Sequence, residues 1–228
     1  MKVEIYSDVA CPWCYIGNAR FERALAAFPG RAAVDVSFRP FQLDPGTPQR
    51  PQPFYEYSDQ RFGPDFRPKH DHVTAVAAKE GLEFRFDRAL AVNTFTAHRL
   101  LWLTERDHGA ATQRALKIAL LRTYFTDGGN IADTDTLVGL AAEVGVDRDR
   151  AKQWLTGDEG AAETIEEIES AQRLGIQAVP TFVFDGRYAV RGAQEASVLL
   201  QALEQVAAES LPATHGDDAA CADGSCAV

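Results

Sequence analysis

Two cysteines separated by only two residues, Cys11 and Cys14, lie where a predicted strand gives way to a predicted helix. β-Branched and aromatic residues between 3 and 6 are typical of a strand, and apolar residues at helical spacing predict a helix from 12 to about 28. Alternating apolar and polar residues from 33 to 41 predict a second strand. A helical crossover of this length joins strands that are parallel neighbours. The sequence therefore predicts a β-α-β unit with a Cys-x-x-Cys pair at the start of its helix.

The middle of the chain is predicted to be helical. Five prolines between 40 and 53 remove N–H donors and fix backbone angles, so this stretch is predicted to be a linker without regular structure. From 54 to 174, helix formers and apolar residues at helical spacing predict an inserted all-helical domain. We expect N-caps at Asp133 or Thr134 and at Asp147. Glycine breaks divide this region into five or six helices, at positions 81, 109, 128, 129, 145 and 157.

The pattern returns to strands after residue 179. Residues 180–184 and 188–191 flank the turn Asp185-Gly186 and predict a β-hairpin. Apolar residues at helical spacing then predict a helix that reaches about Ser210. Residues 211–228 contain almost no large apolar side chain, so they cannot bury enough surface to offset the entropy of ordering. We expect them to form a flexible tail.

Composition limits the environment and the partners of the chain. Its 228 residues allow one large domain or two small ones, and 46% hydrophobic residues allow a sizeable core. A net charge of -10, from 23 basic and 33 acidic residues, disfavours nucleic acids and anionic membranes as partners. No apolar run approaches the roughly 20 residues of a membrane span, and no export signal follows Met1. We therefore expect a cytoplasmic protein, in which a close cysteine pair is more often catalytic or metal-binding than structural.

The Cys-Pro-Trp-Cys sequence is the strongest chemical signal. The free N–H groups and the positive dipole end at a helix N-terminus stabilise an anion, so we expect Cys11 to ionise more easily than Cys14 and to act as a nucleophile. Cys14, one turn further into the helix, would then resolve a mixed disulfide. Pro12 suits the first turn because its missing N–H would have no partner there. Half of a zinc site and two buried structural thiols are the alternatives. No second Cys-x-x-Cys lies at the spacing of a zinc site, and we expect no metal.

A second signal is Val179-Pro180-Thr181, at the boundary between the helical region and the hairpin. Proline is excluded from the interior of a central strand but is tolerated at its first residue. Two interpretations stay open. Either a cis bond turns the backbone towards a neighbouring loop, or Pro180 is a simple strand-start proline.

Together these motifs resemble the DsbA family. The resemblance covers about residues 1–210, and within the family it is strongest to the cytoplasmic FrnE-like branch. It rests on Ser7-Asp8 after the first strand, Cys11-Pro12-Trp13-Cys14 followed by Gly17, the helical insertion, and Val179-Pro180-Thr181 before a hairpin. The resemblance implies an α/β protein with a thioredoxin-like fold formed by residues 1–40 and 175–210, into which the helical domain 54–174 is inserted. It also implies thiol–disulfide exchange as the activity.

The resemblance further implies roles for individual residues. Cys11 would be the attacking thiol, Cys14 the resolving thiol, and Pro180 a cis residue beside them. Val179 would offer backbone hydrogen bonds to an extended peptide that adds as a strand. The implied substrate-binding residues are Pro12, Trp13, Val179, Thr181, Asn93 and His98. For the last two the alternative is a capped helix start and a histidine satisfied at the domain interface.

Two features depart from the family pattern. The best-known exported members carry histidine where this chain has Trp13, and Asp8 adds a negative charge nearby. Both changes favour the thiolate less, so we expect a weaker oxidant that works as a reductase or isomerase. The tail carries Cys221 and Cys226 around a Gly-Ser turn, on a tether long enough to reach the dithiol. We predict this pair to be an auxiliary redox centre, with an idle chain end or a weak metal clamp as the alternative.

The sequence thus predicts a thiol–disulfide oxidoreductase of protein or small-molecule disulfides, without a bound cofactor but with exchange with a thiol such as glutathione. One alternative is a glutathione-dependent enzyme of the kappa-class transferase or hydroxychromene-carboxylate isomerase type. Those relatives carry serine at the first motif position and lack the second cysteine, so Cys11 with Cys14 argues against this alternative. Another alternative is a non-catalytic binding module or chaperone that uses the cleft between domains. The oligomeric state is left open.

Overall fold

The computed structural model describes residues 1–210, so Cys221, Cys226 and the rest of the predicted tail lie outside the described residues. Its main sheet has the strand order β2-β1-β5-β6. The strands are β1 (Lys2–Ser7), β2 (Asp35–Pro40), β5 (Thr181–Phe184) and β6 (Tyr188–Arg191). As predicted, β1 and β2 are parallel and β5 and β6 form an antiparallel hairpin. β5 joins the two halves by pairing antiparallel with β1.

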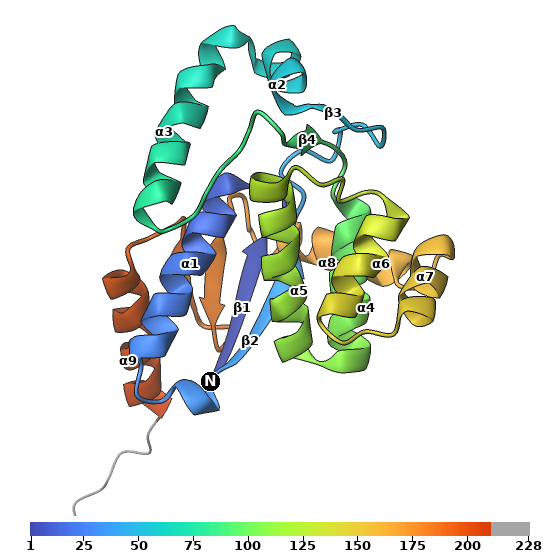
Figure 1. Cartoon of the computed structure of the whole chain (residues 1–228). Helices are drawn as coiled ribbons and strands as arrows, with labels where there is room; N and C mark the ends of the chain where they lie inside the picture. Colours follow the sequence, from blue (N-terminus) through green and yellow to red (C-terminus); the bar gives the residue numbers. More distant parts are fainter. Residues whose placement is uncertain (211–228) are drawn as a thin grey trace, which may run out of the picture.

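Helices cover both faces of this sheet (Figure 1). On one face, Ile5 of β1 and Phe182 of β5 belong to a core that includes α1 (Pro12–Ala27) and α9 (Ala196–Ser210). On the other face, Tyr6 packs with Ala171 of α8 (Ala161–Arg173). Neighbouring residues of β1 thus point to opposite sides, as the two-residue period of a strand requires.

The inserted region contains seven α-helices among the described residues, rather than five or six. They are α2 (Phe54–Phe62), α3 (Arg67–Lys79), α4 (Phe95–His108), α5 (Ala110–Arg122), α6 (Thr134–Glu143), α7 (Arg148–Thr156) and α8. The additional break lies at Gly63, whose φ of 83° and following Pro64 separate α2 from α3. Asp133 and Asp147 cap α6 and α7 by accepting backbone N–H bonds, which confirms both predicted N-caps.

Short helical turns complete the chain between these elements. They are η1 (Arg31–Ala33), η2 (Pro64–Phe66) and the π-helical turn η3 (Thr123–Asp127).

A two-stranded ribbon was not predicted. β3 (Gln52–Pro53) lies in the stretch predicted to lack regular structure, and it pairs with β4 (Leu90–Ala91), which lies within the range predicted to be all-helical. Such a ribbon depends on a partner far away in the sequence, so a local pattern does not reveal it. It ties the start of the insertion to the segment that leads into α4.

The free edge of β2 is covered by α5. The side-chain amide of Gln113 accepts a hydrogen bond from the Phe38 N–H (2.8 Å) and donates one to the Phe38 carbonyl (2.9 Å). The amide therefore imitates a neighbouring strand and blocks an edge that would otherwise be open to pairing. This contact also fixes the face of α5 that approaches the end of β1.

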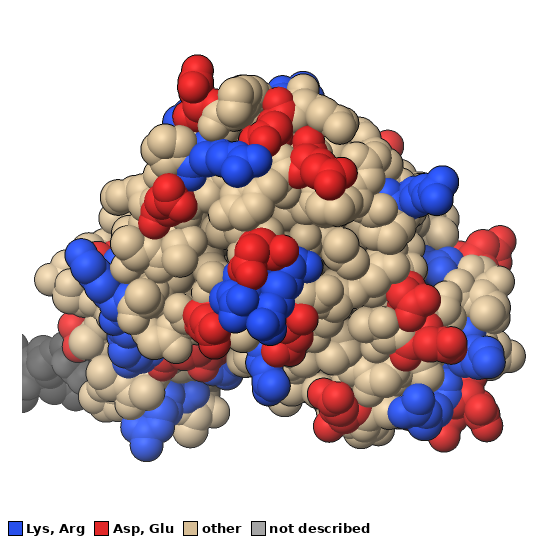
Figure 2. Space-filling model, turned by 45° about the horizontal axis from the view of Figure 1, so that its top comes forward, with Lys and Arg blue, Asp and Glu red and all other residues tan. Residues whose placement is uncertain are grey.

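The described part of the chain contains no helix long and apolar enough to cross a membrane. On the face seen in Figure 2, basic and acidic side chains lie beside one another with uncharged surface between them.

Candidate active site

The dithiol lies at the junction of the sheet and the insertion. Cys11 is the N-cap of α1, Pro12 occupies the first turn, and the Cys14 N–H donates to the Cys11 carbonyl at 3.0 Å. Both cysteines are free thiols, and only 3% and 2% of their surfaces are exposed. Tyr15 and Ile16, which follow Cys14, pack into the large core of the insertion. The dithiol is therefore in a water-poor environment bounded by both parts of the protein.

The loop before β5 faces this pair. The Val179–Pro180 peptide bond is cis, so the first of the two interpretations left open by the sequence applies. The Cys11 thiol lies 3.8 Å from the Val179 carbonyl, to which it donates a hydrogen bond. Gly17 on α1 permits this approach, because a Cβ at that position would lie 2.8 Å from Cγ of Pro180.

Asp8 connects the active-site loop to the insertion. One carboxylate oxygen lies 3.0 Å from Nε2 of His98 on α4, and the other accepts the Leu43 N–H at 2.7 Å. Both side chains are 2% exposed. Burial lowers the pKa of His98 and therefore favours its neutral form. Burial also opposes ionisation of Asp8, but the hydrogen bond from His98 favours the carboxylate. The pKa of Asp8 is therefore lowered on balance.

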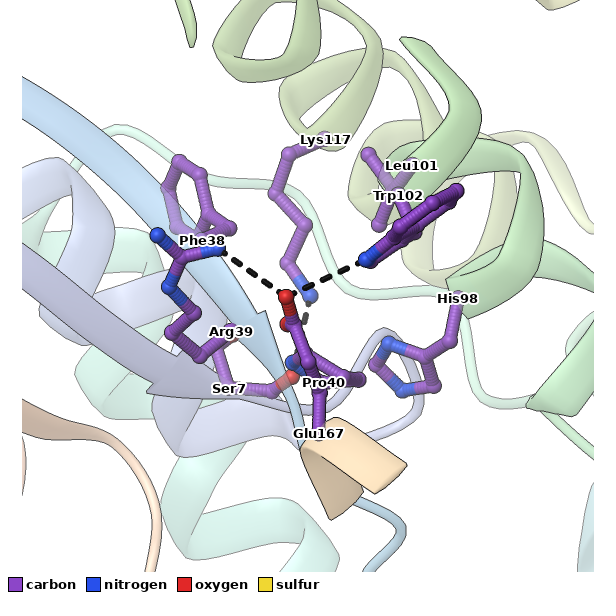
Figure 3. A pocket seen from close by; sticks show the side chains of 9 residues that line it. All are labelled: Ser7, Phe38, Arg39, Pro40, His98, Leu101, Trp102, Lys117 and Glu167. Carbon is purple, nitrogen blue, oxygen red and sulfur yellow. Dashed lines mark hydrogen bonds and ion pairs between the residues drawn. The ribbon is translucent and has the colours of Figure 1, made fainter. Parts of the chain in front are cut away.

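Lys117 of α5 is completely buried and approaches the same region from the insertion. Its ammonium group donates a hydrogen bond to the Ser7 carbonyl at 3.4 Å and lies 5.6 Å from the centre of the Phe38 ring. Figure 3 shows its side chain running from α5 towards the end of β1, beside a cavity that His98 and Glu167 also line. This cavity has a volume of about 10 Å³, room for roughly one water molecule. Burial lowers the pKa of Lys117 to about 8, although the negative charges at Cys14 and Asp8 act in the opposite direction.

The two thiols ionise as a pair. The hydrogen bond between them, burial and the negative charge of Cys14 raise the pKa of Cys11 well above its ordinary value. Burial also opposes ionisation of Cys14, but the bond from Cys11 and the charge of Lys117 lower the pKa of Cys14 on balance. These effects oppose ionisation of Cys11, and the order in which the two thiols ionise stays a prediction. The Cys14 N–H at the helix start does favour the Cys11 thiolate, but the other effects outweigh it.

The structure brings some of the predicted substrate-binding residues to the dithiol and not others. Trp13 is 38% exposed beside Cys11, with its ring centre 6.3 Å from that of His72. Thr181 is buried and donates to the Ala178 carbonyl at 2.7 Å, so its hydroxyl is occupied within the loop. Trp13 is therefore accessible to a bound substrate, whereas the Thr181 side chain is not.

Asn93 and His98 fit the alternative given for them. The Asn93 amide donates to the carbonyls of Pro45 and Thr47, and its oxygen accepts the Phe95 N–H at 2.9 Å at the start of α4. His98 is satisfied by Asp8 at the boundary between the two parts. Asn93 therefore holds a loop to a helix start, while His98 reaches the dithiol region only through Asp8.

Sequence reasoning missed Lys117. The buried face of α5 consists of Gln113, Leu116, Lys117, Leu120 and Leu121. Two polar residues four positions apart in an apolar stripe are the signal that could have marked a buried polar contact. Within residues 1–210, no group of three or more histidine, cysteine or acidic side chains is arranged to hold a metal ion.

Residues 2–204 match the family described as the DSBA-like thioredoxin domain. The chain belongs to this DsbA-like family. The match confirms the predicted family and the thioredoxin-like fold with a helical insertion, and the FrnE-like branch stays a prediction.

Solved structures agree with this assignment. The DsbA-like chain is 40% identical to a probable DsbA oxidoreductase, SCO1869, from Streptomyces coelicolor, with a TM-score of 0.84 over 100% of this chain and 99% of that one. The cytosolic disulfide reductase DsbM from Pseudomonas aeruginosa, also solved with GSH, shares the fold at 20% identity, with a TM-score of 0.66 over 92% and 100% of the two chains. A 2-hydroxychromene-2-carboxylate isomerase does so at 17% identity, with a TM-score of 0.64 over 92% and 97%.

Proposed function

We propose that the chain catalyses thiol–disulfide exchange at Cys11 and Cys14. One observation carries the proposal: in a DsbA-like chain, two free thiols occupy the start of α1, and the first lies 3.8 Å from the carbonyl that precedes Pro180. An extended substrate that bonds to the backbone of Val179 would place its disulfide beside Cys11. Trp13, exposed on the same side, offers an apolar surface for the substrate to pack on.

The exchange takes two steps. Cys11 loses its proton to solvent and attacks one sulfur of a substrate disulfide, so that the Cys11–substrate bond forms and the other substrate sulfur leaves as a thiolate. Cys14 then loses its proton to that leaving thiolate or to solvent and attacks the Cys11 sulfur. The second substrate thiolate departs, and the enzyme keeps both cysteines as a disulfide. Two electrons have then moved from the enzyme to the substrate.

The protein needs a thiol to return its disulfide to the dithiol, and we propose glutathione for this role. DsbM, which shares the fold, is a cytosolic disulfide reductase that has been solved with GSH, and this supports the proposal. Asp8 beside the pair also disfavours the Cys11 thiolate, which fits a reductase or isomerase better than a strong oxidant. We therefore place the protein in the cytoplasm and expect protein or small-molecule disulfides as substrates.

The glutathione-dependent isomerase remains a second candidate because a hydroxychromene-carboxylate isomerase shares the fold. Two free thiols beside the cis-proline loop favour exchange, because an isomerase that only binds glutathione has no use for a resolving thiol. Glutathione-dependent conversion of such a substrate that survives Cys11→Ser and Cys14→Ser would reverse this preference.

Trapping of the mixed disulfide tests the proposal. In a background with Cys221→Ser and Cys226→Ser, the Cys14→Ser variant treated with oxidised glutathione should keep one glutathione on Cys11, as measured by peptide mass spectrometry. The protein with both active-site cysteines should release it, and Cys11→Ser should accumulate far less. Equal labelling of Cys11→Ser, or none in any variant, would contradict the proposal.

The same background tests the predicted role of the tail pair. If Cys221 and Cys226 pass electrons to or from the dithiol, their removal slows turnover with glutathione while trapping at Cys11 persists. Unchanged turnover would exclude the auxiliary redox centre.

A further inference from the structure

Arg20 of α1 holds three separate segments of the chain together. Its Nε donates to a carboxylate oxygen of Glu80 at 2.6 Å, and one Nη lies 2.8 Å from the Glu195 carboxylate. The other Nη donates to the backbone carbonyl of Ala193 at 2.7 Å. All three guanidinium nitrogens are thus engaged, and the side chain is only 12% exposed. Because the donors of arginine form a rigid planar fork, these contacts fix the relative positions of the three partners.

The bond to Ala193 leads to the loop that faces the dithiol. Ala193 follows Gly192, whose N–H donates to the Pro180 carbonyl at 2.7 Å. Ala193 also lies against α1 at Gly17, where an added Cβ would be 3.4 Å from the Ala193 Cα. Arg20 comes one turn after Gly17, so it lies on the same face of α1 and binds Ala193 there. Two hydrogen bonds, made by neighbouring residues, therefore connect Arg20 to the cis-proline.

The bond to Glu80 connects Arg20 to the helix beside the exposed Trp13. Glu80 is the C-cap residue of α3, whose end lies beside α1 in Figure 1, and only 5% of its side chain is exposed. About two turns earlier on α3, the ring centre of His72 lies 6.3 Å from that of Trp13. Arg20 therefore links the helix that flanks Trp13 to the segment that bonds to the loop before β5.

Arg23 provides a comparison on the same helix. It lies one turn further along α1 and binds the second carboxylate oxygen of Glu80. Its side chain is 49% exposed, and within residues 1–210 its polar contact is with Glu80 alone. Arg23 therefore helps to attach α3 without reaching Ala193. Since Arg20 and Arg23 carry the same charge, a comparison of the two separates the contact with Ala193 from the effect of charge.

We propose that Arg20 is a positioning residue for substrate binding: by holding the Ala193 carbonyl, it keeps the Val179–Pro180 loop in the geometry that an extended substrate requires. The inference rests on the proposed function, in which the Val179 backbone binds the substrate. Arg20 acts through the loop, because its guanidinium is already engaged by Glu80, Glu195 and the Ala193 carbonyl. Its loss should therefore weaken the binding of peptides more than it slows the exchange of sulfurs.

Kinetics with two kinds of disulfide test the proposal, with Cys221→Ser and Cys226→Ser in every variant and glutathione as reductant. An extended peptide in mixed disulfide with glutathione can pair with the Val179 backbone, whereas the aromatic disulfide dithiobis(nitrobenzoate) is too small to add as a strand. We expect Arg20→Met to raise KM for the peptide by about fivefold or more, while kcat and the rate with the aromatic disulfide change by less than about twofold. Arg20→Lys should restore part of the peptide KM.

The matched control is Arg23→Met, which should change the kinetics with both disulfides by less than about twofold. An unchanged peptide KM in folded Arg20→Met would overturn the proposal. An equal loss of activity with both disulfides, or the same rise in peptide KM in Arg23→Met, would overturn it as well, because either result indicates a general structural role.

Hydrogen exchange of the Gly192 N–H tests the same contact without a substrate. This amide donates to the Pro180 carbonyl, so it should exchange faster when loss of the Arg20 bond frees Ala193. Arg20→Gln is a milder change than Arg20→Met, and its side chain is too short to bond both Glu80 and Ala193. We expect exchange about fivefold faster or more in Arg20→Gln, as measured by NMR, and unaltered exchange in Arg23→Met.

Equal exchange at Gly192 in Arg20→Gln and the unaltered chain would overturn the inference, even if Arg20→Met does not fold. The exchange measurement does not depend on activity. If the unaltered chain turned over neither disulfide while Arg20→Gln still accelerated exchange at Gly192, the proposed function alone would be rejected.

Discussion

Burial of Lys117 carries a stability cost that depends on pH. Its pKa falls from an ordinary value of 10.5 to about 8 in the folded chain, so between these values the unfolded chain binds more protons. Stability therefore rises with pH across that window, by about 3 kcal/mol at roughly 1.4 kcal/mol per pKa unit.

Lys117→Met should abolish this rise. In a background with Cys11→Ser and Cys14→Ser, which removes thiol titration, we expect the variant to be more stable than its parent at pH 7 by an amount of that order. The difference should shrink towards pH 10. Urea unfolding at several pH values measures it, and an undiminished rise with pH in the variant would show that Lys117 is not its source.

Only some of the individual residues at the candidate site could be predicted from the sequence. Cys11, Cys14 and Pro180 could be selected because their spacing and order along the chain are local patterns. Lys117 could not, because its importance arises only when α5 packs against the end of β1. The order of ionisation of the two thiols stays a prediction, because the helix position of Cys11 is visible in the sequence whereas the surroundings of each sulfur are not.

Among the secondary-structure elements, the contact between α1 and the loop before β5 positions the dithiol. Gly17 gives α1 the space to approach Pro180, since an added Cβ would lie 2.8 Å from the proline ring. Gly17→Ala should therefore displace the Val179 carbonyl from Cys11 and lower kcat/KM for disulfide exchange by about tenfold or more.

Gly139→Ala on α6 is the matched control. A Cβ at Gly139 meets nothing within 4 Å, so this change should leave exchange unaltered and add up to about 1 kcal/mol of stability. Turnover of a fluorescent disulfide substrate compares the two variants, and equal activity would show that the close approach at Gly17 does not matter.

The strands and helices with strong periodicity were predicted correctly, including the parallel pair β1 and β2 and the hairpin β5-β6. The ribbon of β3 and β4 was missed because each strand has only two residues, too few for a periodic signal. The break at Gly63 was missed because the helical pattern on both sides hides it.

For the whole molecule, an ion network joins the sheet to the insertion. Arg39 of β2 binds Glu4 of β1 at 2.9 Å, Glu105 of α4 at 3.0 Å and Glu167 of α8 at 3.3 Å. Burial raises the pKa of both Glu105 and Glu167, while Arg39 favours their ionised forms. One guanidinium therefore holds three carboxylates from three elements together.

Arg39→Met should destabilise the chain by up to about 3 kcal/mol near pH 7, the lower end of the range for breaking a buried ion pair. Carboxylates whose pKa is raised by folding favour the native state when protonated, so the loss should diminish as the pH falls towards 4.5. Thermal melts at pH 5 and pH 7.5 measure this, and an equal loss at both values would contradict the role of charge.

The division into a thioredoxin-like part and a helical insertion could be predicted from the order of the motifs. The contacts between the insertion and the dithiol region could not be predicted from the sequence. His98 and Lys117 both come from the insertion, and both approach the end of β1 from helices whose packing depends on the complete fold.

The most direct test of the account is the reduction of insulin disulfides with dithiothreitol as the electron source, comparing the intact protein with Cys11→Ser. The account predicts that the intact protein accelerates insulin precipitation and that Cys11→Ser does not exceed the uncatalysed rate. Equal activity of the two proteins, or no activity in either, would contradict general exchange at Cys11 and would favour a glutathione-dependent or narrowly specific reaction.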